Sequence, residues 1–495
     1  MRLTDLLRGA GIDAADLATT PSVDVHDVSL SSSTVLPGSV FAALPGHRTH
    51  GATYALDAIS AGAVAIVTDP AGARMIGTVD VPIIVLDEPR SALARLAATL
   101  WDHPSTDMTM IGVTGTNGKT SVTHLIQAAL VRNGIPCAVI GTLGTMFDGL
   151  DGSSHPRTTP EAPDLQATLA AVRDAGAAAV AMEVSSIAVC EHRVDSIAFD
   201  IAVFTGLTHD HLDYHGTMQS YFEAKADLFE PSRASSGVVM IDDEWGRSLK
   251  ERARIPITTV SATGAAADWR ARIDGDRVSI EGLDTAVVHL PVPTGFAVAN
   301  LALSVAVAHA LHIPAQLAAD AAVGARIPGR MELVRSTGGV AFVVDYAHTP
   351  DAIRQVVTAC SGLRAERQGR VIVVLGAGGD RDSTKRSDMG RAASGADIVI
   401  VTDDNPRSED PAAIRSAVLA GVRGSGCEVT EVADRREAIA FAVQTAQSGD
   451  IVLVLGKGHE TTQEFADHVL AFDDRSVLAF FVEERFGGVE EGGRT

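Results

Sequence analysis

Short apolar runs alternate along this chain with longer stretches in which apolar residues recur at helical spacing. In the first part of the chain the apolar runs lie at residues 40–44, 63–69 and 82–87, and the sequence WDHPS at 101–105 interrupts the pattern. Strands that alternate with turns and helices predict a small α/β domain that ends at this interruption.

The same alternation starts again near residue 108 and once more near residue 340. The second series of apolar runs lies at 108–115, 177–184, 200–207 and 237–243, and the third opens the stretches 340–353, 370–382, 396–407 and 450–460. Such alternation predicts parallel sheets covered by helices on both faces. We therefore predict an α/β fold with three domains, at residues 1–105, 106–329 and 330–495.

Composition limits the possible partners. The formal net charge of -22 argues against nucleic acid, although a few cations in a cleft would suffice for an anionic small substrate. The widely separated cysteines predict reduced, buried thiols. No apolar run approaches the roughly 20 residues that cross a bilayer, and the N-terminus carries acidic residues early, unlike a secretory signal. We expect a cytoplasmic protein that binds neither nucleic acid nor membrane.

The strongest local signal is GTNGKT at residues 115–120, between a predicted strand and a predicted helix. Glycines let backbone N–H groups approach phosphate oxygens, and a helix N-terminus favours negative charge. In such a loop Lys119 would reach the terminal phosphates and Thr120 would bind Mg²⁺. The motif is not a strict Walker A sequence because Val113 occupies the position of its first glycine.

Carboxylates and imidazoles follow two further predicted strands. Glu183 ends the apolar run at 177–184, where a hard oxygen donor suits Mg²⁺. The segment THDHLDYHG at 208–216 follows the run at 200–207 and carries His209, His211 and His215. The segment could be a solvated loop, but strand C-termini in α/β sheets are where ligands bind, which favours a site.

Two other features remain ambiguous when judged by their residues alone. Lys225 lies in the helical stretch YFEAKADLF, where a lone lysine usually belongs to a solvated face. The segment RTTPEAPD at 157–164 could bind an anionic group or could cap the helix that follows it.

Taken in order, these segments resemble the Mur ligase family, and within it the enzymes that add the third residue of the peptidoglycan stem peptide. The resemblance spans nearly the whole chain and rests on the following motifs: VSLSSSTVLPGSVFAALPG, GTNGKTS, TTPE, EVSS, DHLDYHGTM, YFEAKADLF, IPGRME, DYAHTPD, GGDRD, DNPR and GKGHE. Any one motif is weak, but their joint occurrence in one order is specific.

The resemblance implies a UDP-sugar domain, a central P-loop-type ATPase domain and a Rossmann-like C-terminal domain for the incoming amino acid. It also implies an ATP- and Mg²⁺-dependent ligase acting on UDP-N-acetylmuramoyl-L-Ala-D-Glu in cell-wall synthesis, and thereby in cell shape and division. The D-glutamyl carboxylate would become an acyl phosphate, which the amino group of the third residue then attacks. We expect a monomer whose partners are small-molecule substrates.

The resemblance also assigns roles by position. ATP would be bound by Gly115, Thr116, Asn117, Gly118, Lys119, Thr120 and Ser121, together with Asn300, Arg330, Asp345 and His348. The UDP-muramyl-dipeptide would be bound by Leu30, Ser32, Thr158, Thr159, Ser185, Glu191 and Arg193. Thr120, Glu183, His211 and Lys225 would be Mg²⁺ ligands, Lys225 as an N-carbamate, and Lys119, Glu183, His211 and Lys225 would be catalytic.

The motif DNPR, Asp404, Asn405, Pro406 and Arg407, resembles the form found in enzymes that add diaminopimelate. A guanidinium at Arg407 would bind the distal carboxylate of diaminopimelate, a group that lysine lacks. Arg381, Gly456 and Glu460 would complete this amino-acid pocket.

Three alternatives stay open. The chain could add lysine or ornithine, it could use a related acceptor such as folate, or it could be a weakly active paralogue that senses cell-wall precursors. TTPE and DNPR argue against the folate acceptor. The presence of Lys119, Glu183, His211 and Lys225 speaks against the sensor, whereas the departures from the family pattern at Ile187, Gly206 and Ala297 keep it open. Further departures lie at Ser31 to Ser33, Arg157 and Glu191.

Overall fold

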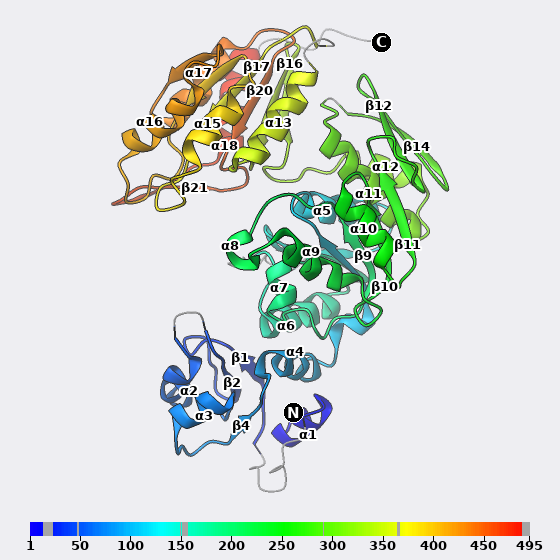
Figure 1. Ribbon diagram of the computed structural model, residues 1–495, viewed down its shortest axis with the longest axis vertical. Helices are drawn as coiled ribbons and strands as arrows, with labels where there is room; N and C mark the ends of the chain where they lie inside the picture. Colours follow the sequence, from blue (N-terminus) through cyan, green and yellow to red (C-terminus); the bar gives the residue numbers. More distant parts are fainter. Residues whose placement is uncertain are drawn as a thin grey trace. The chain divides into compact units, whose positions relative to one another are not determined.

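The computed structural model describes residues 1–12, 23–46, 49–148, 150, 157–290, 292–363 and 367–487. The chain forms two compact units, one of Met1–Arg270, Ile280–Ala286 and Ala299–Ala322, the other of Ala271–Ser279, Val287–Val298 and Val323–Thr495. Each unit is described by itself (Figure 1).

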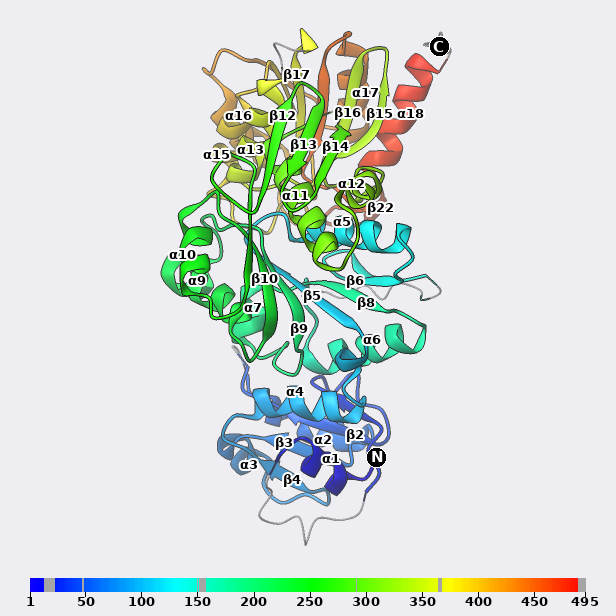
Figure 2. The same cartoon turned by 90° about the vertical axis from the view of Figure 1, so that its right-hand side faces the viewer.

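The N-terminal part of the first unit is a four-stranded parallel sheet in the order β1-β2-β3-β4. Its elements are α1 (Leu3–Gly9), β1 (Asp27–Ser29), β2 (Ser39–Ala43), α2 (Ala55–Ser60), β3 (Ala65–Thr68), α3 (Pro70–Ile76), β4 (Ile83–Val85) and α4 (Pro89–Leu100). Alternate residues of β2 face opposite sides: Val40 packs with α1 and α4, and Phe41 packs with α2. Figure 2 shows α4 along one side of this sheet.

The central region is built on a ten-stranded sheet in the order β14-β13-β12-β11-β10-β9-β5-β8-β6-β7. Its first elements are β5 (Thr109–Thr114), α5 (Lys119–Arg132), β6 (Cys137–Gly141), β7 (Gly144–Met146), α6 (Ala162–Asp174), β8 (Ala179–Glu183), α7 (Ser186–Cys190), β9 (Phe199–Phe204), α8 (Leu212–His215) and α9 (Met218–Ala226). The remaining elements are β10 (Ala234–Met240), α10 (Glu244–Arg252), β11 (Ile257–Ser261), β12 (Trp269–Asp274), β13 (Arg277–Glu281), β14 (Thr285–His289), α11 (Gly295–Ala310) and α12 (Ala315–Val323).

The strands from β11 to β6 all pair in parallel, as the apolar runs predict. Helix α5 ends at the C-cap Asn133, and Gly134 follows at a φ of 85°, which is a common way for a helix to end. Strand β7 pairs antiparallel with β6, an addition that the sequence pattern did not predict. A run of only three residues carries too little periodicity to be recognised.

The C-terminal region has a six-stranded sheet in the order β15-β16-β20-β17-β18-β19. Its elements are β15 (Glu332–Thr337), β16 (Val340–Asp345), α13 (Pro350–Gly362), β17 (Val371–Leu375), α15 (Arg386–Ala393), β18 (Ile398–Val401), α16 (Pro411–Val422), β19 (Glu428–Glu431), α17 (Arg435–Thr445), β20 (Ile451–Leu455), β21 (Thr462–Glu464), β22 (Val469–Ala471) and α18 (Asp474–Phe486). Within the six-stranded sheet every strand pair is parallel except β15 with β16, and β21 pairs antiparallel with β22 in a separate two-stranded sheet.

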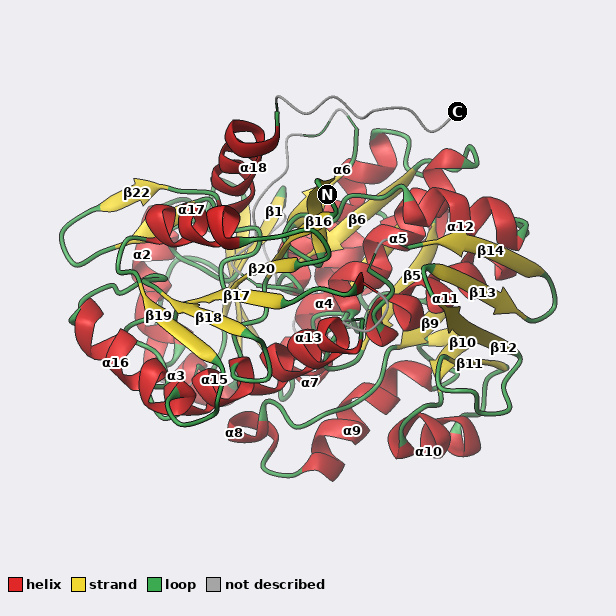
Figure 3. Cartoon of the chain, turned by 90° about the horizontal axis from the view of Figure 1, so that it is seen from above, coloured by secondary structure: helices red, strands yellow, loops and turns green. Residues whose placement is uncertain are grey.

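Both faces of this C-terminal sheet are buried. Along β17, Val371 and Val373 pack with α13, α15 and α16, whereas Ile372 and Val374 pack with α17 and α18. Figure 3 shows the two groups of helices on opposite sides of the strands. Two-sided burial explains why these strands are continuous apolar runs rather than alternating ones.

One expectation about the cysteines is wrong. None of the four forms a disulfide, and Cys137 and Cys360 are buried as expected, but Cys190 is exposed at the end of α7. No helix in the part of the chain that the structure describes has the length and apolar character needed to cross a membrane.

Candidate functional site

Three neighbouring strands of the central sheet end at the same edge. Strand β5 lies between β9 and β8, and all three run in parallel, so their C-terminal residues lie side by side. Beyond β5 comes the loop at residues 115–118, β8 ends on Glu183, and His211 follows β9. The topology therefore gathers three segments that are far apart in the sequence at the edge where α/β sheets bind ligands.

The loop at 115–118 has the geometry of a phosphate-binding loop. Gly118 has a φ of 86°, and a Cβ there would lie 2.6 Å from Oδ1 of Asn300. Lys119 begins α5, and its Nζ donates to the carbonyl oxygens of Gly115 and Thr116, at 3.0 and 2.9 Å. The loop thus requires glycine and presents the start of a 14-residue helix, which is the arrangement that favours phosphate.

A pocket of about 330 Å³ opens beside this loop, and we call it the central pocket. Its walls combine cations with hydroxyl groups, which suits an anionic, hydrogen-bonding ligand. The lining residues are Lys119, Arg157, Thr158, Thr159, Ser185, Ser186, Ile187, Arg193, His211, Tyr221 and Lys225. Seven of the residues predicted from the sequence are thereby brought together: Lys119, Thr158, Thr159, Ser185, Arg193, His211 and Lys225.

The expectation from local sequence that Lys225 lies on a solvated helix face is wrong. Its side chain is 1% exposed, its Nζ donates to the carbonyl of Gly115 at 2.9 Å, and its ammonium lies 4.6 Å above the ring of Tyr221. Burial, with the nearby charge of Lys119, holds the pKa of Lys225 well below its usual range. The surroundings of Lys225 therefore disfavour its ammonium form.

Glu183 lies against the start of helix α5. This carboxylate is buried, and its Oε1 accepts hydrogen bonds from the Thr120 hydroxyl at 3.0 Å and from the backbone N–H of Thr142 at 2.8 Å. Threonine hydroxyl and carboxylate oxygens are ligands that Mg²⁺ accepts, so this pair fits such an ion. In the described ranges no three His, Cys, Asp or Glu side chains are close enough together to hold a metal ion. His211 and Lys225, the other two predicted Mg²⁺ ligands, line the central pocket.

The TTPE segment is tied to the EVSS segment by direct hydrogen bonds. The Thr159 hydroxyl donates to the carbonyl of Glu183 at 2.9 Å and accepts from the backbone N–H of Ser185 at 3.1 Å. Arg193 donates to the Thr159 carbonyl at 3.3 Å and pairs with Glu161 at 3.0 Å. Nε of Arg193 is buried without a partner, and burial lowers the pKa of this guanidinium. Such an incompletely satisfied cation is suited to an anionic ligand.

Sequence analysis missed several residues of this site. Tyr221 precedes Lys225 by four residues on α9, and its hydroxyl lies 3.2 Å from that of Thr116. The i, i+4 spacing is a signal that could have paired Tyr221 with Lys225. Arg90 of α4 pairs with Glu191 at 3.0 Å and Glu161 at 3.5 Å, so the predicted substrate residue Glu191 is held by an arginine from the N-terminal part. Nothing in the sequence indicates this long-range contact.

Other predicted residues lie outside the central pocket. Leu30 and Ser32 follow β1 in the N-terminal part, and Leu30 is partly buried against its core. In the second unit, the carboxylate of Asp345 accepts from the backbone N–H groups of Met331 and Ala347, and burial raises its pKa. The guanidinium of Arg330 lies 4.5 Å from the centre of the Tyr346 ring, and the ring of His348 lies 4.5 Å from the same centre.

The residues predicted to bind the amino acid gather at the C-terminal edge of the second unit's sheet. Asp404, Asn405, Pro406 and Arg407 follow β18, and Gly456 and Glu460 follow β20. Asn405 donates through Nδ2 to Glu460 at 2.8 Å, and a Cβ on Gly456 would lie 2.5 Å from Oδ2 of Asp404. Arg381 is exposed, and Gly378 lies between it and Arg407, since a Cβ on Gly378 would approach both side chains.

Comparisons with known proteins agree with this geometry. Three family models match successive parts of the chain: the Mur ligase family catalytic domain at residues 24–101, the Mur ligase middle domain at 113–308 and the Mur ligase glutamate ligase domain at 329–458. The chain belongs to the Mur ligase family. It is an ATP-dependent ligase with the N-terminal, middle and C-terminal domains of that family.

Two curated relatives and two solved structures show how close the match is. A UDP-N-acetylmuramoyl-L-alanyl-D-glutamate–2,6-diaminopimelate ligase of Streptomyces coelicolor is 43% identical, covering 98% of this chain and 97% of the relative. A ligase of the same name from Corynebacterium glutamicum is 42% identical over 92% of this chain and 91% of its own length.

A solved structure of a ligase with this name is 33% identical, with a TM-score of 0.67 over 93% of this chain and 95% of that one. MurF ligase of Thermotoga maritima, solved with ADP, shares the fold at 19% identity, with a TM-score of 0.60 over 93% and 97% of the two chains.

Within the Mur ligase fold, the departures from the family pattern have definite positions. Arg157 and Ile187 line the central pocket. Gly206 has a φ of 119°, and a Cβ there would lie 2.9 Å from Oδ2 of Asp243. The structure thus explains glycine at 206 by backbone conformation, which a larger residue would strain.

Proposed function

We propose that this Mur ligase joins diaminopimelate to the D-Glu carboxylate of UDP-N-acetylmuramoyl-L-Ala-D-Glu at the expense of ATP. The observation that carries the proposal is the central pocket, where Lys119 of the phosphate loop, Arg193 and the TTPE hydroxyls line one cavity of about 330 Å³. A nucleotide phosphate and a substrate carboxylate could meet only where such cations and hydroxyls converge. The names of the full-length relatives support the same reaction.

The phosphate loop would bind ATP through residues 115–121 with Asn300. On ligand binding Lys119 would exchange its two carbonyl acceptors for phosphate oxygens, which carry more negative charge. Arg330, Asp345 and His348 are proposed to contact the nucleotide as well, on the resemblance alone. The carboxylate of the substrate would attack the γ-phosphorus, the bond to the β–γ bridging oxygen would break to release ADP, and the developing charge would fall beside Lys119.

Thr120, Glu183, His211 and a carbamylated Lys225 would hold Mg²⁺, which supplies charge neutralisation for phosphoryl transfer when bound. The hydrogen bond between the Thr120 hydroxyl and Glu183, at 3.0 Å, supports the first two ligands, and the lowered pKa of Lys225 supports carbamate formation. The neutral amine of Lys225 would add to CO₂ with loss of one proton to solvent, which would convert the amine into an anionic carbamate ligand.

Arg193, Thr158, Thr159, Ser185 and Glu191 would orient the muramyl-dipeptide, and Leu30 and Ser32 its UDP group. The amino group of diaminopimelate then attacks the acyl phosphate and expels phosphate. Arg381, Asp404, Asn405, Pro406, Arg407, Gly456 and Glu460 would bind diaminopimelate. We further propose domain boundaries at residues 105 and 329, a monomeric state, a cytoplasmic location and a role in cell-wall biogenesis and division.

Phosphate release tests this function. The purified chain is supplied with ATP, Mg²⁺ and UDP-N-acetylmuramoyl-L-Ala-D-Glu, and each of meso- and LL-diaminopimelate, lysine and ornithine is added separately. We expect release that depends on a diaminopimelate isomer. Preference for lysine or ornithine would contradict the substrate assignment, and silence with every amino acid would favour the precursor-sensing paralogue.

A further inference from the structure

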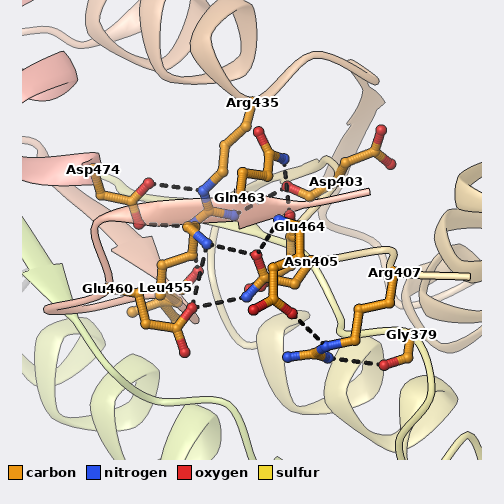
Figure 4. A network of polar contacts seen from close by, with 12 residues as sticks. Gly379, Asp403, Asn405, Arg407, Arg435, Leu455, Glu460, Gln463, Glu464 and Asp474 are labelled. Carbon is orange, nitrogen blue, oxygen red and sulfur yellow. Dashed lines mark hydrogen bonds and ion pairs between the residues drawn. The ribbon is translucent and has the colours of Figure 1, made fainter. Parts of the chain in front are cut away.

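The guanidinium of Arg407 is held in one orientation by two acceptors. Its Nε donates to Oε2 of Glu464 at 2.7 Å, and its Nη1 donates to the carbonyl of Gly379 at 2.8 Å (Figure 4). Arg407 also has a φ of 50°, a left-handed conformation that is uncommon for arginine. Backbone and side chain are therefore both constrained at this position.

Glu464 is itself fixed by its backbone. Its carbonyl accepts from the N–H of Arg407 at 3.0 Å, and its N–H donates to Oδ1 of Asn405 at 3.0 Å. The adjacent Gln463 donates to the carbonyl of Asp404 at 2.8 Å. Strand β21 is thus hydrogen-bonded along the DNPR segment, so the backbone of Glu464 is fixed where its carboxylate contacts Arg407.

The orientation of Asn405 is set by a buried lysine. Nζ of Lys457, whose side chain is fully buried, donates to Oδ1 of Asn405 at 2.9 Å. An ammonium can only donate, so the amide oxygen must face Lys457 and the N–H of Glu464, and Nδ2 must face Glu460. Lys457 therefore fixes the Asn405 amide, which in turn holds the backbone of Glu464 beside Arg407.

The two acceptors leave one edge of the Arg407 guanidinium available. A planar guanidinium can bind a carboxylate bidentately through its terminal nitrogens or through Nε and one terminal nitrogen. Glu464 accepts from Nε and Gly379 accepts from one N–H of Nη1, so the second N–H of Nη1 and both N–H bonds of Nη2 have no acceptor among the residues that the structure describes. The side chain of Arg407 is 25% exposed, so the terminal edge can be reached by a ligand.

We propose that Glu464 is a positioning residue for amino-acid selection, because it holds Arg407 by Nε and so presents the terminal edge of the guanidinium to a substrate carboxylate. This inference rests on the proposed function, since it takes diaminopimelate as the ligand of Arg407. Alternatively, the Glu464 carboxylate could occupy the position on Arg407 that the substrate carboxylate would take, and so compete with the substrate. The contact to Nε rather than to the terminal nitrogens favours positioning.

Steady-state kinetics of Glu464→Ala and Glu464→Gln test the assignment. Loss of the acceptor in Glu464→Ala should raise the KM for diaminopimelate about ten-fold, whereas the amide oxygen of Glu464→Gln should retain part of the contact and limit the rise to about three-fold. The kcat and the KM for ATP should stay within about two-fold in both variants, because the phosphate-binding residues are untouched.

Glu483→Gln is the matched control, because it removes the carboxylate of another exposed Arg–Glu pair, that with Arg335, in the same unit. It should leave all three constants unchanged. A lower KM in either Glu464 variant would show that Glu464 competes with the substrate, and an unchanged KM in Glu464→Ala would remove any role for it. Failure of the wild-type chain to use diaminopimelate would instead overturn the proposed function, so the two failures are distinguishable.

Discussion

At the scale of single residues, the surroundings of Lys225 decide its chemistry. A lysine on a nine-residue helix is solvated in most proteins, but this one is 1% exposed and faces the carbonyl of Gly115 and the ring of Tyr221. Desolvation disfavours the ammonium form, and the charge of Lys119 acts in the same direction. A neutral amine in this position can carry a carboxylate that an ammonium cannot.

Replacement of Lys225 should therefore abolish ligation without unfolding the chain. We expect Lys225→Ala to lower ATP-dependent phosphate release by at least about 100-fold, the usual loss when one group that stabilises transition-state charge is removed. Formate or acetate should restore part of the activity by supplying the missing carboxylate. The exposed lysine at 250 provides the control, and Lys250→Ala should behave as the wild type. No rescue by small carboxylates would count against the carbamate.

His459 should make stability depend on pH. Burial first, then the charge of Arg330, lowers the pKa of His459 to about 4 from the ordinary 6.5. Between these values the unfolded chain binds more protons than the folded one, so stability is complete above pH 6.5 and falls as the pH drops towards 4. Urea unfolding at pH 7 and pH 5 should show a smaller difference for His459→Gln than for the wild type. Equal differences would contradict this role.

At the scale of elements, the phosphate loop depends on close approach as well as on backbone conformation. Gly118→Ala would strain a φ of 86° and also force a Cβ against Oδ1 of Asn300. Gly134, at the other end of α5, has a similar φ of 85° but open space around its Cβ. Strain alone costs about 1 kcal/mol in each variant, and the contact with Asn300 adds a further loss of stability only in Gly118→Ala. Only Gly118→Ala should raise the KM for ATP, by more than about ten-fold, and an equal rise in Gly134→Ala would refute the argument.

The sequence predicts elements well where they are buried on both faces. The apolar runs at 371–375 and 451–455 form central parallel strands, and their continuous apolar character and short length were enough to predict them. The grouping of Glu183 and the loop at 115–118 followed from their places at strand ends. Contacts such as Arg90 with Glu191 could not be predicted, because they depend on how α4 packs rather than on any local pattern. The burial of Lys225 likewise comes from packing of α9, and only the family resemblance anticipated it.

At the scale of the whole molecule, the residues predicted to act lie mainly at the carboxyl ends of parallel strands in the ten-stranded and six-stranded sheets. A chain of net charge -22 can still serve anionic substrates, because Lys119, Arg193 and Arg407 are concentrated at these edges. A negative net charge is thus compatible with local groups of cations, and composition argues against nucleic acid without arguing against a nucleotide.

The most direct measurement is the mass of the product formed from an equimolar mixture of diaminopimelate, lysine and ornithine. The substrate UDP-N-acetylmuramoyl-L-Ala-D-Glu would carry ¹⁸O in its D-Glu carboxylate. The account predicts one product, the diaminopimelate adduct, together with ¹⁸O in the released phosphate, because the carboxylate oxygen leaves with the phosphoryl group. A lysine or ornithine adduct, or phosphate free of ¹⁸O, would contradict it.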